Sequence, residues 1–287
     1  MNTYQQGFSS IARSIRSEHE GDSKPTQAIC KPFMYFNEKK KMIRLLILVT
    51  LVMILTGCKT QQPSRNIVTT DVMNFWIAYD NITATQDSIL QYKFLDSLYF
   101  QKGTDGLKAI RQLRNYTSQD YIHAINNYPD FWNAIRENTL KSDQLSSALE
   151  KGIRKLKEIY PNIKPAKIYF TIGALRTNGT TLDSLVLIGS ELALANKETP
   201  TNEFPDNLSH LRNYFDSEPS ENIVFLNIHE YIHTQQQTTI GYNLLAQSVI
   251  EGVAEFVAEK ALDIHSPNPQ IEFGRNNDAQ IKAKFKL

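Results

Sequence analysis

The sequence predicts an α+β domain, and three changes of pattern along the chain predict it. Apolar residues recur at spacings of three and four between Asp71 and Tyr160, which indicates amphipathic helices. Two short runs rich in β-branched and aromatic residues follow, and helical spacing then returns in two longer segments that end near Leu262. A helical N-terminal half, a small sheet and two long helices therefore make up the predicted fold.

The segment before this domain is typical of an exported protein. Basic residues from Lys39 to Arg44 precede an apolar run that is shorter than the roughly 20 residues needed to cross a membrane. Leu55-Thr56-Gly57-Cys58 then resembles the lipobox of bacterial lipoproteins, in which the cysteine becomes diacylated. We therefore expect a signal peptide over residues 42–57, and a lipidated Cys58 with a polar tether over residues 58–70.

Residues 1–41 are polar and would sit upstream of the signal peptide, so we expect translation to start at Met34 or Met42. Residues 1–41 then lie outside the folded protein, so the mature chain also lacks Cys30. A mature chain without any cysteine except Cys58 can form no structural disulfide, thiolate metal site or cysteine nucleophile. Any metal must be bound by His, Asp or Glu.

Charge and lipidation together indicate where the protein works. The formal net charge is +1 and the basic residues are spread along the chain, which disfavours nucleic-acid binding. The lipid on Cys58 implies attachment to a membrane of the cell envelope, facing the periplasm or the cell surface. Because Lys59 and not aspartate follows the cysteine, we prefer the outer membrane.

The helical half contains several separate helices. The periodic segments are 89–99, 107–113, 121–131 and 145–159, with Pro129 interrupting the third and Pro161 ending the last. Aromatic residues at helical spacing could line a groove for a partner, but packing in the core is the stronger prediction. These residues are Phe75, Trp76, Tyr79, Phe131 and Trp132.

The second half begins with two predicted strands, Pro165–Ile172 and Leu185–Leu194, separated by a turn signal at Asn178-Gly179-Thr180. Two long helices follow over Ile223–Gln236 and Tyr242–Leu262. The chain ends at Leu287 without a helix stop signal, so we expect the domain that starts at Asp71 to continue into further helices.

The first long helix carries the motif HExxH, as His229-Glu230-Tyr231-Ile232-His233. Residues i and i+4 project from one helical face, so both imidazoles can reach a single Zn²⁺, while Glu230 points toward a metal-bound water. Partly buried core histidines are the alternative interpretation. A zinc site also needs a third ligand.

Glu251 is the preferred third ligand. Seventeen residues separate it from His233, enough for the chain to turn near Gly241 and return antiparallel. Glu255 lies one turn further on the same face and could accept the free ring N–H of a ligating histidine. A solvated helix face is the alternative for both. His123, His210 and His265 have no partner at ligand spacing and are expected at the surface.

Two resemblances follow from these motifs. HEYIH followed by EGVAEF resembles the gluzincin aminopeptidases. The lipobox, YPDFW, LDSLVLIGSEL and HEYIHTQQ together resemble predicted zinc-dependent lipoproteins related to the gliding-motility lipoproteins. This resemblance implies a zincin-like fold with Zn²⁺ as cofactor, and no known substrate.

The sequence therefore supports two functional hypotheses. In the first, the protein is a membrane-anchored zinc metallopeptidase with Glu230 as general base, and a peptide substrate pairs with a sheet edge formed by Leu185, Val186, Leu187 and Ile188. Tyr242 and His210 are candidate oxyanion donors, and neither is preferred. In the second, a non-catalytic lipoprotein keeps the zincin fold as an assembly or interaction component with envelope protein partners.

Overall fold

The computed structural model describes residues 66–236 and 243–285, all within one unit that spans Gln62–Leu287. The predicted signal peptide, Cys58 and Tyr242 lie outside the described residues. Among the helices that are described, none is both long and apolar enough to cross a membrane.

The N-terminal half is helical, as predicted. Its elements are α2 (Thr70–Thr83), α3 (Ser88–Phe94), the π-helix η1 (Leu95–Phe100), α4 (Asp105–Leu113), α5 (Ser118–Asn127), α6 (Pro129–Leu140), the 3₁₀ helix η2 (Lys141–Leu145) and α7 (Ser146–Ile159). Local sequence fixes several of the boundaries. Thr117 and Asp120 form a reciprocal capping box at the start of α5, and Pro129 occupies the first turn of α6, where its missing N–H costs nothing.

The aromatic residues of this half form the core, and that prediction is confirmed. Phe75, Trp76, Phe131 and Trp132 are at most 1% exposed, and Tyr79 is 5% exposed. The two indole N–H groups are satisfied within the core, since Trp76 donates to Oγ1 of Thr139 and Trp132 to the carbonyl of Ala124.

The sheet has four strands in the order β1-β2-β4-β3, formed by β1 (Ile67–Val68), β2 (Lys167–Thr171), β4 (Leu185–Gly189) and β3 (Gly179–Leu182). β1 and β4 both pair parallel to β2, and β3 pairs antiparallel to β4. The predicted α+β class is confirmed.

Four sequence-based assignments in this region are wrong. Leu185, Val186, Leu187 and Ile188 do not form a sheet edge, because β4 lies between β2 and β3. A continuous apolar run is typical of a strand covered on both faces, and that is the environment of β4. The edge strand on this side of the sheet is β3. It begins at Gly179, inside the predicted turn, and the chain reverses at Asp183, which has a left-handed φ of 51°.

The other two differences concern strand limits. The predicted strand Leu185–Leu194 ends at Gly189, and α8 (Ser190–Ala193) follows. At the N-terminus, Ile67 and Val68 lie within the predicted tether but pair with β2, and Ile67 is 6% exposed. A strand of two residues carries too little periodicity to be recognised in sequence.

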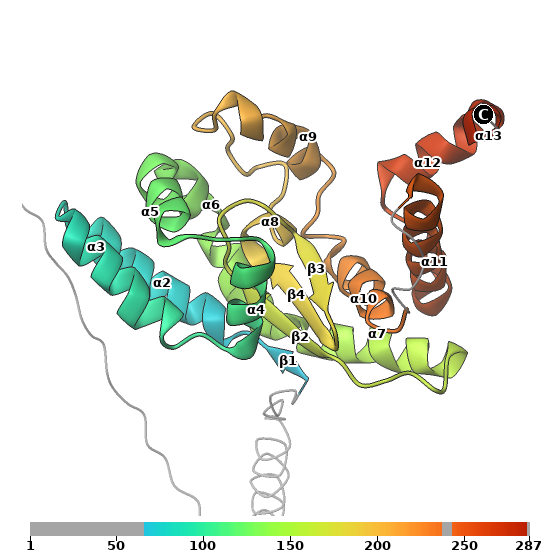
Figure 1. Ribbon diagram of the computed structural model, residues 1–287, viewed down its shortest axis with the longest axis horizontal. Coiled ribbons are helices and arrows are strands. Elements are labelled where there is room, and N and C mark those ends of the chain that lie inside the picture. The colour runs from blue at the N-terminus through green and yellow to red at the C-terminus, as the bar shows by residue number, and fades with distance from the viewer. Residues whose placement is uncertain (1–65, 237–242, 286–287) are drawn as a thin grey trace, which may run out of the picture. The chain divides into compact units, whose positions relative to one another are not determined.

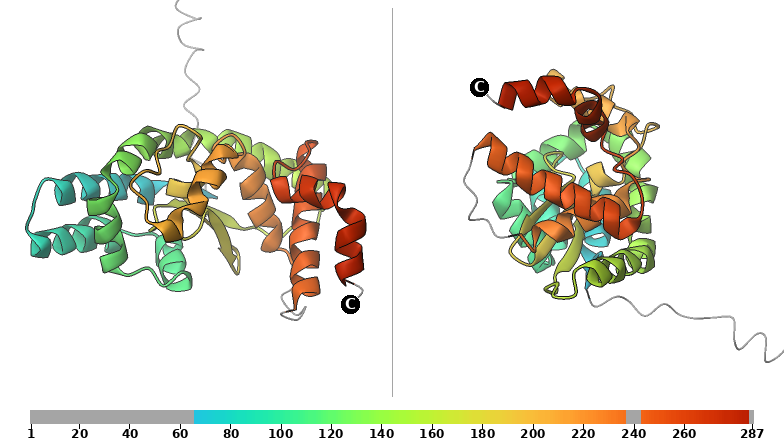
Figure 2. Two further views of the ribbon diagram at one scale, coloured as in Figure 1. Left: turned by 90° about the horizontal axis from the view of Figure 1, so that it is seen from above. Right: turned by 90° about the vertical axis from the view of Figure 1, so that its right-hand side faces the viewer.

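The remaining elements are η3 (Asp206–Leu208), α9 (His210–Asp216), α10 (Ile223–His233), α11 (Leu244–Leu262), α12 (Pro269–Asn276) and α13 (Asp278–Phe285). α10 packs beside β3 and β4, and α11 packs along α10 (Figure 1). α7 contacts both helices. The left view of Figure 2 shows α11, α12 and α13 together on the side of the sheet away from α2 and α3. The two predicted long helices are thus confirmed as neighbours.

Candidate metal centre

Three side chains from α10 and α11 bring one ligand atom each to a common point. Nε2 of His229 and Nε2 of His233 lie 3.0 Å apart, and each is 3.3 Å from Oε2 of Glu251. The histidines come from successive turns of α10, while Glu251 approaches from the facing helix. These three residues are the ones that the motif spacing selects, and the structure brings them together.

The other ring nitrogen of each histidine is held by a neighbour. Nδ1 of His229 lies 2.9 Å from Oε2 of Glu255, and Nδ1 of His233 lies 2.7 Å from Oε1 of Gln236. A carboxylate or amide oxygen can only accept, so in the neutral ring these neighbours favour a proton on Nδ1 and leave the lone pair of Nε2 for a cation. Such an arrangement prepares both rings for a cation.

Each of these neighbours is itself fixed. Oε1 of Glu255 accepts hydrogen bonds from Asn268 at 2.8 Å and from the hydroxyl of Ser266, and the residue is 5% exposed. Gln236 donates through Nε2 to the carbonyl of Ile250 at 2.8 Å, which connects the end of α10 to α11. The histidine rings therefore have little freedom to turn.

The electrostatics of the cluster follow from two imidazoles placed among carboxylates. Burial alone would lower the pKa of His229, but Glu251 and Glu255 outweigh it and raise the pKa to about 9. Contacts with His229 and His233 hold the pKa of Glu251 well below its usual range. The neighbouring carboxylates thus favour a positive charge on or between the two rings.

Glu230 lies beside the cluster and at the edge of the sheet. It is 8% exposed, and burial raises the pKa of its carboxyl while His233 and His229 oppose that rise. A Cβ atom placed on Gly179, the first residue of β3, would lie 2.9 Å from Oε1 of Glu230. The missing side chain at Gly179 thus allows β3 to approach Glu230 closely.

These groups open onto a cleft of about 480 Å³. The residues that line it include His229, Glu230, Glu251, Asn178 and Tyr214. The side chain of Glu251 is 60% exposed, against 13% for His229, so a bound cation would be reachable from the cleft. Such an open position distinguishes a reactive or ligand-binding metal site from a closed structural one.

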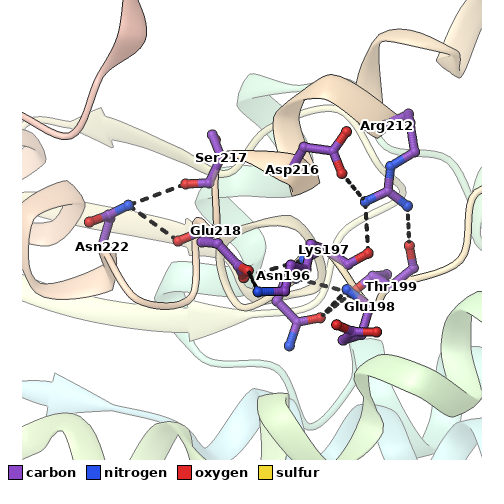
Figure 3. Close-up of polar contacts among 9 residues, drawn as sticks. All are labelled: Asn196, Lys197, Glu198, Thr199, Arg212, Asp216, Ser217, Glu218 and Asn222. Carbon is purple, nitrogen blue, oxygen red and sulfur yellow. Dashed lines mark hydrogen bonds and ion pairs between the residues drawn. The ribbon is translucent and has the colours of Figure 1, made fainter.

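A polar network surrounds the segment that precedes α10, and its residues Ser217 and Asn222 line the cleft (Figure 3). Arg212 on α9 donates to the carbonyls of Thr199 and Lys197 at 2.8 and 3.0 Å and pairs with Asp216 at 2.8 Å. This guanidinium attaches α9 to the loop that follows α8.

The same network continues to the start of α10. Lys197 pairs with Glu218 at 3.0 Å, and Asn222 donates to the carbonyls of Ser217 and Glu218. Glu218 has a left-handed φ of 53°, so this turn is held in a conformation that side chains disfavour. The network therefore positions both α9 and the first turn of α10.

Comparison with known families identifies the chain. The model of the family described as gliding motility protein GldB matches residues 61–284. The chain belongs to the GldB family of gliding-motility lipoproteins. Membership places it at a membrane of the cell envelope. No match is found among curated proteins or among solved structures.

Some site residues were not recognised in the sequence. Gln236 follows His233 by three residues, a helical spacing that could have indicated the contact. Tyr214 carries no such signal, because only the fold brings α9 to the cleft. Of the candidate oxyanion donors, His210 is exposed and does not line the cleft. His123 and His265 are exposed, as predicted.

Proposed function

We propose that this GldB-family protein is a zinc-binding component of the gliding-motility machinery, anchored by a lipid on Cys58 in a membrane of the envelope, by preference the outer membrane. The convergence of His229, His233 and Glu251 on one point carries the proposal. Envelope proteins are its partners, and its domain is of the zincin type.

The donor set fits Zn²⁺. Two imidazoles and one carboxylate are a common zinc set, and ligand atoms about 2.0–2.1 Å from a tetrahedral ion lie roughly 3.3 Å from one another. The separations of 3.0, 3.3 and 3.3 Å are close to that value. Glu255 and Gln236 would orient the two rings, and bound zinc would supply a Lewis acid that polarises a carbonyl or a water molecule.

Peptide hydrolysis is a second candidate function, and one observation favours it. The carboxylate of Glu230 lies in the cleft beside both histidines, and no described residue donates a hydrogen bond to it. It is therefore free to accept a proton from water and to pass it to a leaving amine. β3 is an edge strand next to Glu230, so an extended peptide could pair with it.

Metal analysis tests the first proposal. The purified protein should contain about one zinc per chain, and His229→Ala, His233→Ala and Glu251→Ala should each lower that content strongly. His123→Ala is the matched control, because His123 is exposed on α5 and away from the cleft. A wild-type protein that takes up no zinc at neutral pH would overturn the proposal.

Glu230→Gln separates the two functions. This variant keeps the zinc ligands, so its zinc content should equal that of the wild type. If it restores gliding to a deletion strain, zinc serves binding or assembly. If it abolishes gliding at normal abundance, and wild-type protein cleaves a mixed peptide library that the variant leaves intact, the protein is a peptidase.

A further inference from the structure

Tyr214 on α9 has a hydroxyl group whose hydrogen bonding is incomplete. Its oxygen accepts a hydrogen bond from Nδ2 of Asn178 at 2.9 Å. The amide orientation of Asn178 is fixed, because its Oδ1 accepts from the backbone N–H of Gly179 at 2.8 Å. An amide NH₂ group only donates, so the hydroxyl proton of Tyr214 must point elsewhere.

No acceptor for that proton is present in the described parts of the chain. Tyr214 lines the cleft together with His229 and Glu230. Its side chain is partly buried, and burial raises its pKa to about 12, so the hydroxyl keeps its proton at every physiological pH. The cleft therefore contains a donor that no group in the described residues satisfies.

A short chain of contacts relates this donor to Glu230. Tyr214 bonds to Asn178, the next residue is Gly179, and Gly179 lies against the carboxylate of Glu230. The tyrosine also stands on a fixed helix, since Arg212 attaches α9 to the loop at Lys197 and Thr199 (Figure 3). A donor on a fixed helix, in the same cleft as His229 and Glu251, suits recognition of a ligand oxygen.

We propose that Tyr214 donates a hydrogen bond to an oxygen of the scissile or metal-facing amide of a peptide bound in the cleft, with Asn178 as its positioning residue. The ligand class is an extended peptide. This inference rests on the proposed zinc site, because the peptide oxygen would lie between Tyr214 and the ion.

The test uses two probes on the zinc-loaded protein. Acetohydroxamate binds the metal alone and reports whether the zinc site exists. A phosphinic pseudo-tripeptide carries a tetrahedral P–O⁻ in place of the amide carbonyl and can also reach Tyr214. Tyr214→Phe should weaken the phosphinic probe by about tenfold to a hundredfold, the effect of losing a hydrogen bond to a charged oxygen. It should leave zinc content and acetohydroxamate affinity unchanged.

Two further variants make the test specific. Tyr160→Phe removes an equivalent hydroxyl from an exposed tyrosine and should leave both probes unaffected. Asn178→Asp keeps the acceptor for Gly179 but presents a carboxylate to Tyr214, which should draw the hydroxyl proton away from the cleft. The added charge of Asn178→Asp also repels the phosphinic probe directly, and this repulsion is the same with or without the hydroxyl of Tyr214. A double-mutant cycle with Tyr214→Phe therefore isolates the part of the affinity change that depends on the hydroxyl proton.

The outcomes separate the inference from the proposed function. Weaker phosphinic binding in Tyr214→Phe, with a smaller effect of Asn178→Asp in that background, supports the inference. Equal phosphinic affinity in Tyr214→Phe and wild type overturns it, as does a zinc-loaded wild type that binds acetohydroxamate but not the phosphinic probe. A wild type with neither zinc nor acetohydroxamate binding overturns the zinc site, and the inference with it.

Discussion

Replacing Glu255 by glutamine tests whether the carboxylate behind His229 contributes to zinc binding. Oε2 of Glu255 lies 2.9 Å from Nδ1 of His229, and the residue is 5% exposed. Glutamine has the same size and still offers an acceptor, but it carries no charge. A buried hydrogen bond to a charged group contributes about 1.5–3 kcal/mol, and a neutral one about 0.5–1.5 kcal/mol.

The difference between the two kinds of bond sets the expected effect. A loss of about 1–1.5 kcal/mol in zinc binding corresponds to a Kd roughly tenfold higher in Glu255→Gln. That value lies at the lower end of the range of about 10–100-fold seen when the partner of a ligating histidine is removed. Competition against a chromophoric chelator at neutral pH measures the Kd directly, and circular dichroism checks that the variant is folded.

Glu259→Gln is the matched control. Glu259 lies one turn further along α11, carries the same charge, and accepts hydrogen bonds from the backbone of Ser266 and from Arg275. Its replacement should leave the zinc Kd within about twofold. Equal Kd values for Glu255→Gln and wild type would refute the reasoning, and so would equal losses in the two variants.

Three further predictions concern other parts of the fold. Gln236→Ala removes the acceptor for Nδ1 of His233 and should weaken zinc binding about tenfold in the same titration. Glu191 is fully buried, and burial raises its pKa from 4.5 to about 7, so the folded protein keeps a proton that the unfolded chain has lost. Protonated Glu191 therefore stabilises the fold fully below pH 4.5. The free energy of unfolding should fall by about 3 kcal/mol as the pH rises from 4.5 to 7, at about 1.4 kcal/mol per pH unit. Urea unfolding across this range should show that slope, and Glu191→Gln should remove it. Gly106→Ala places a Cβ atom 2.2 Å from the ring of Tyr169 and should lower the free energy of unfolding by about 1–3 kcal/mol or more.

Each of these predictions has a defined contrary result. A Gln236→Ala variant with wild-type zinc affinity would show that the position of His233 does not depend on this contact. Parallel pH profiles for wild type and Glu191→Gln would show that another group titrates. Gly252→Ala is the control for Gly106→Ala, since nothing lies within 4 Å of its added Cβ and the helix should gain up to about 1 kcal/mol; equal effects of the two would contradict the packing argument.

Local patterns in the sequence determined much of the fold and the centre of the site. Amphipathic spacing predicts the helices of the N-terminal half, because the spacing of apolar residues reflects the 3.6-residue turn wherever one face is buried. The HExxH motif places His229 and His233 on one face of α10 for the same reason, and both Nε2 atoms meet at 3.0 Å. The spacing between His233 and Glu251 predicts the third ligand, because the seventeen intervening residues allow the chain to return antiparallel.

Sheet order could not be obtained in the same way. The apolar run Leu185–Ile188 predicts a strand correctly, but such a run does not determine which strands pair with it on either side. Gly179 and its neighbours predict a turn by residue preference, and pairing with β4 makes them an edge strand instead. Strand pairing is a non-local contact, and local propensity yields to it.

The sequence by itself predicted the candidate ligands and the helices that carry them, because the two histidines lie one helical turn apart and the spacing to Glu251 allows an antiparallel return. Only the tertiary structure decided what surrounds those ligands. Tyr214 on α9 and Asn178, just before β3, line the cleft with Glu230, and Gly179 lies against the Glu230 carboxylate. Packing between segments distant in sequence brings these residues together. Such contacts depend on how the whole chain buries its apolar surface, which no local pattern records.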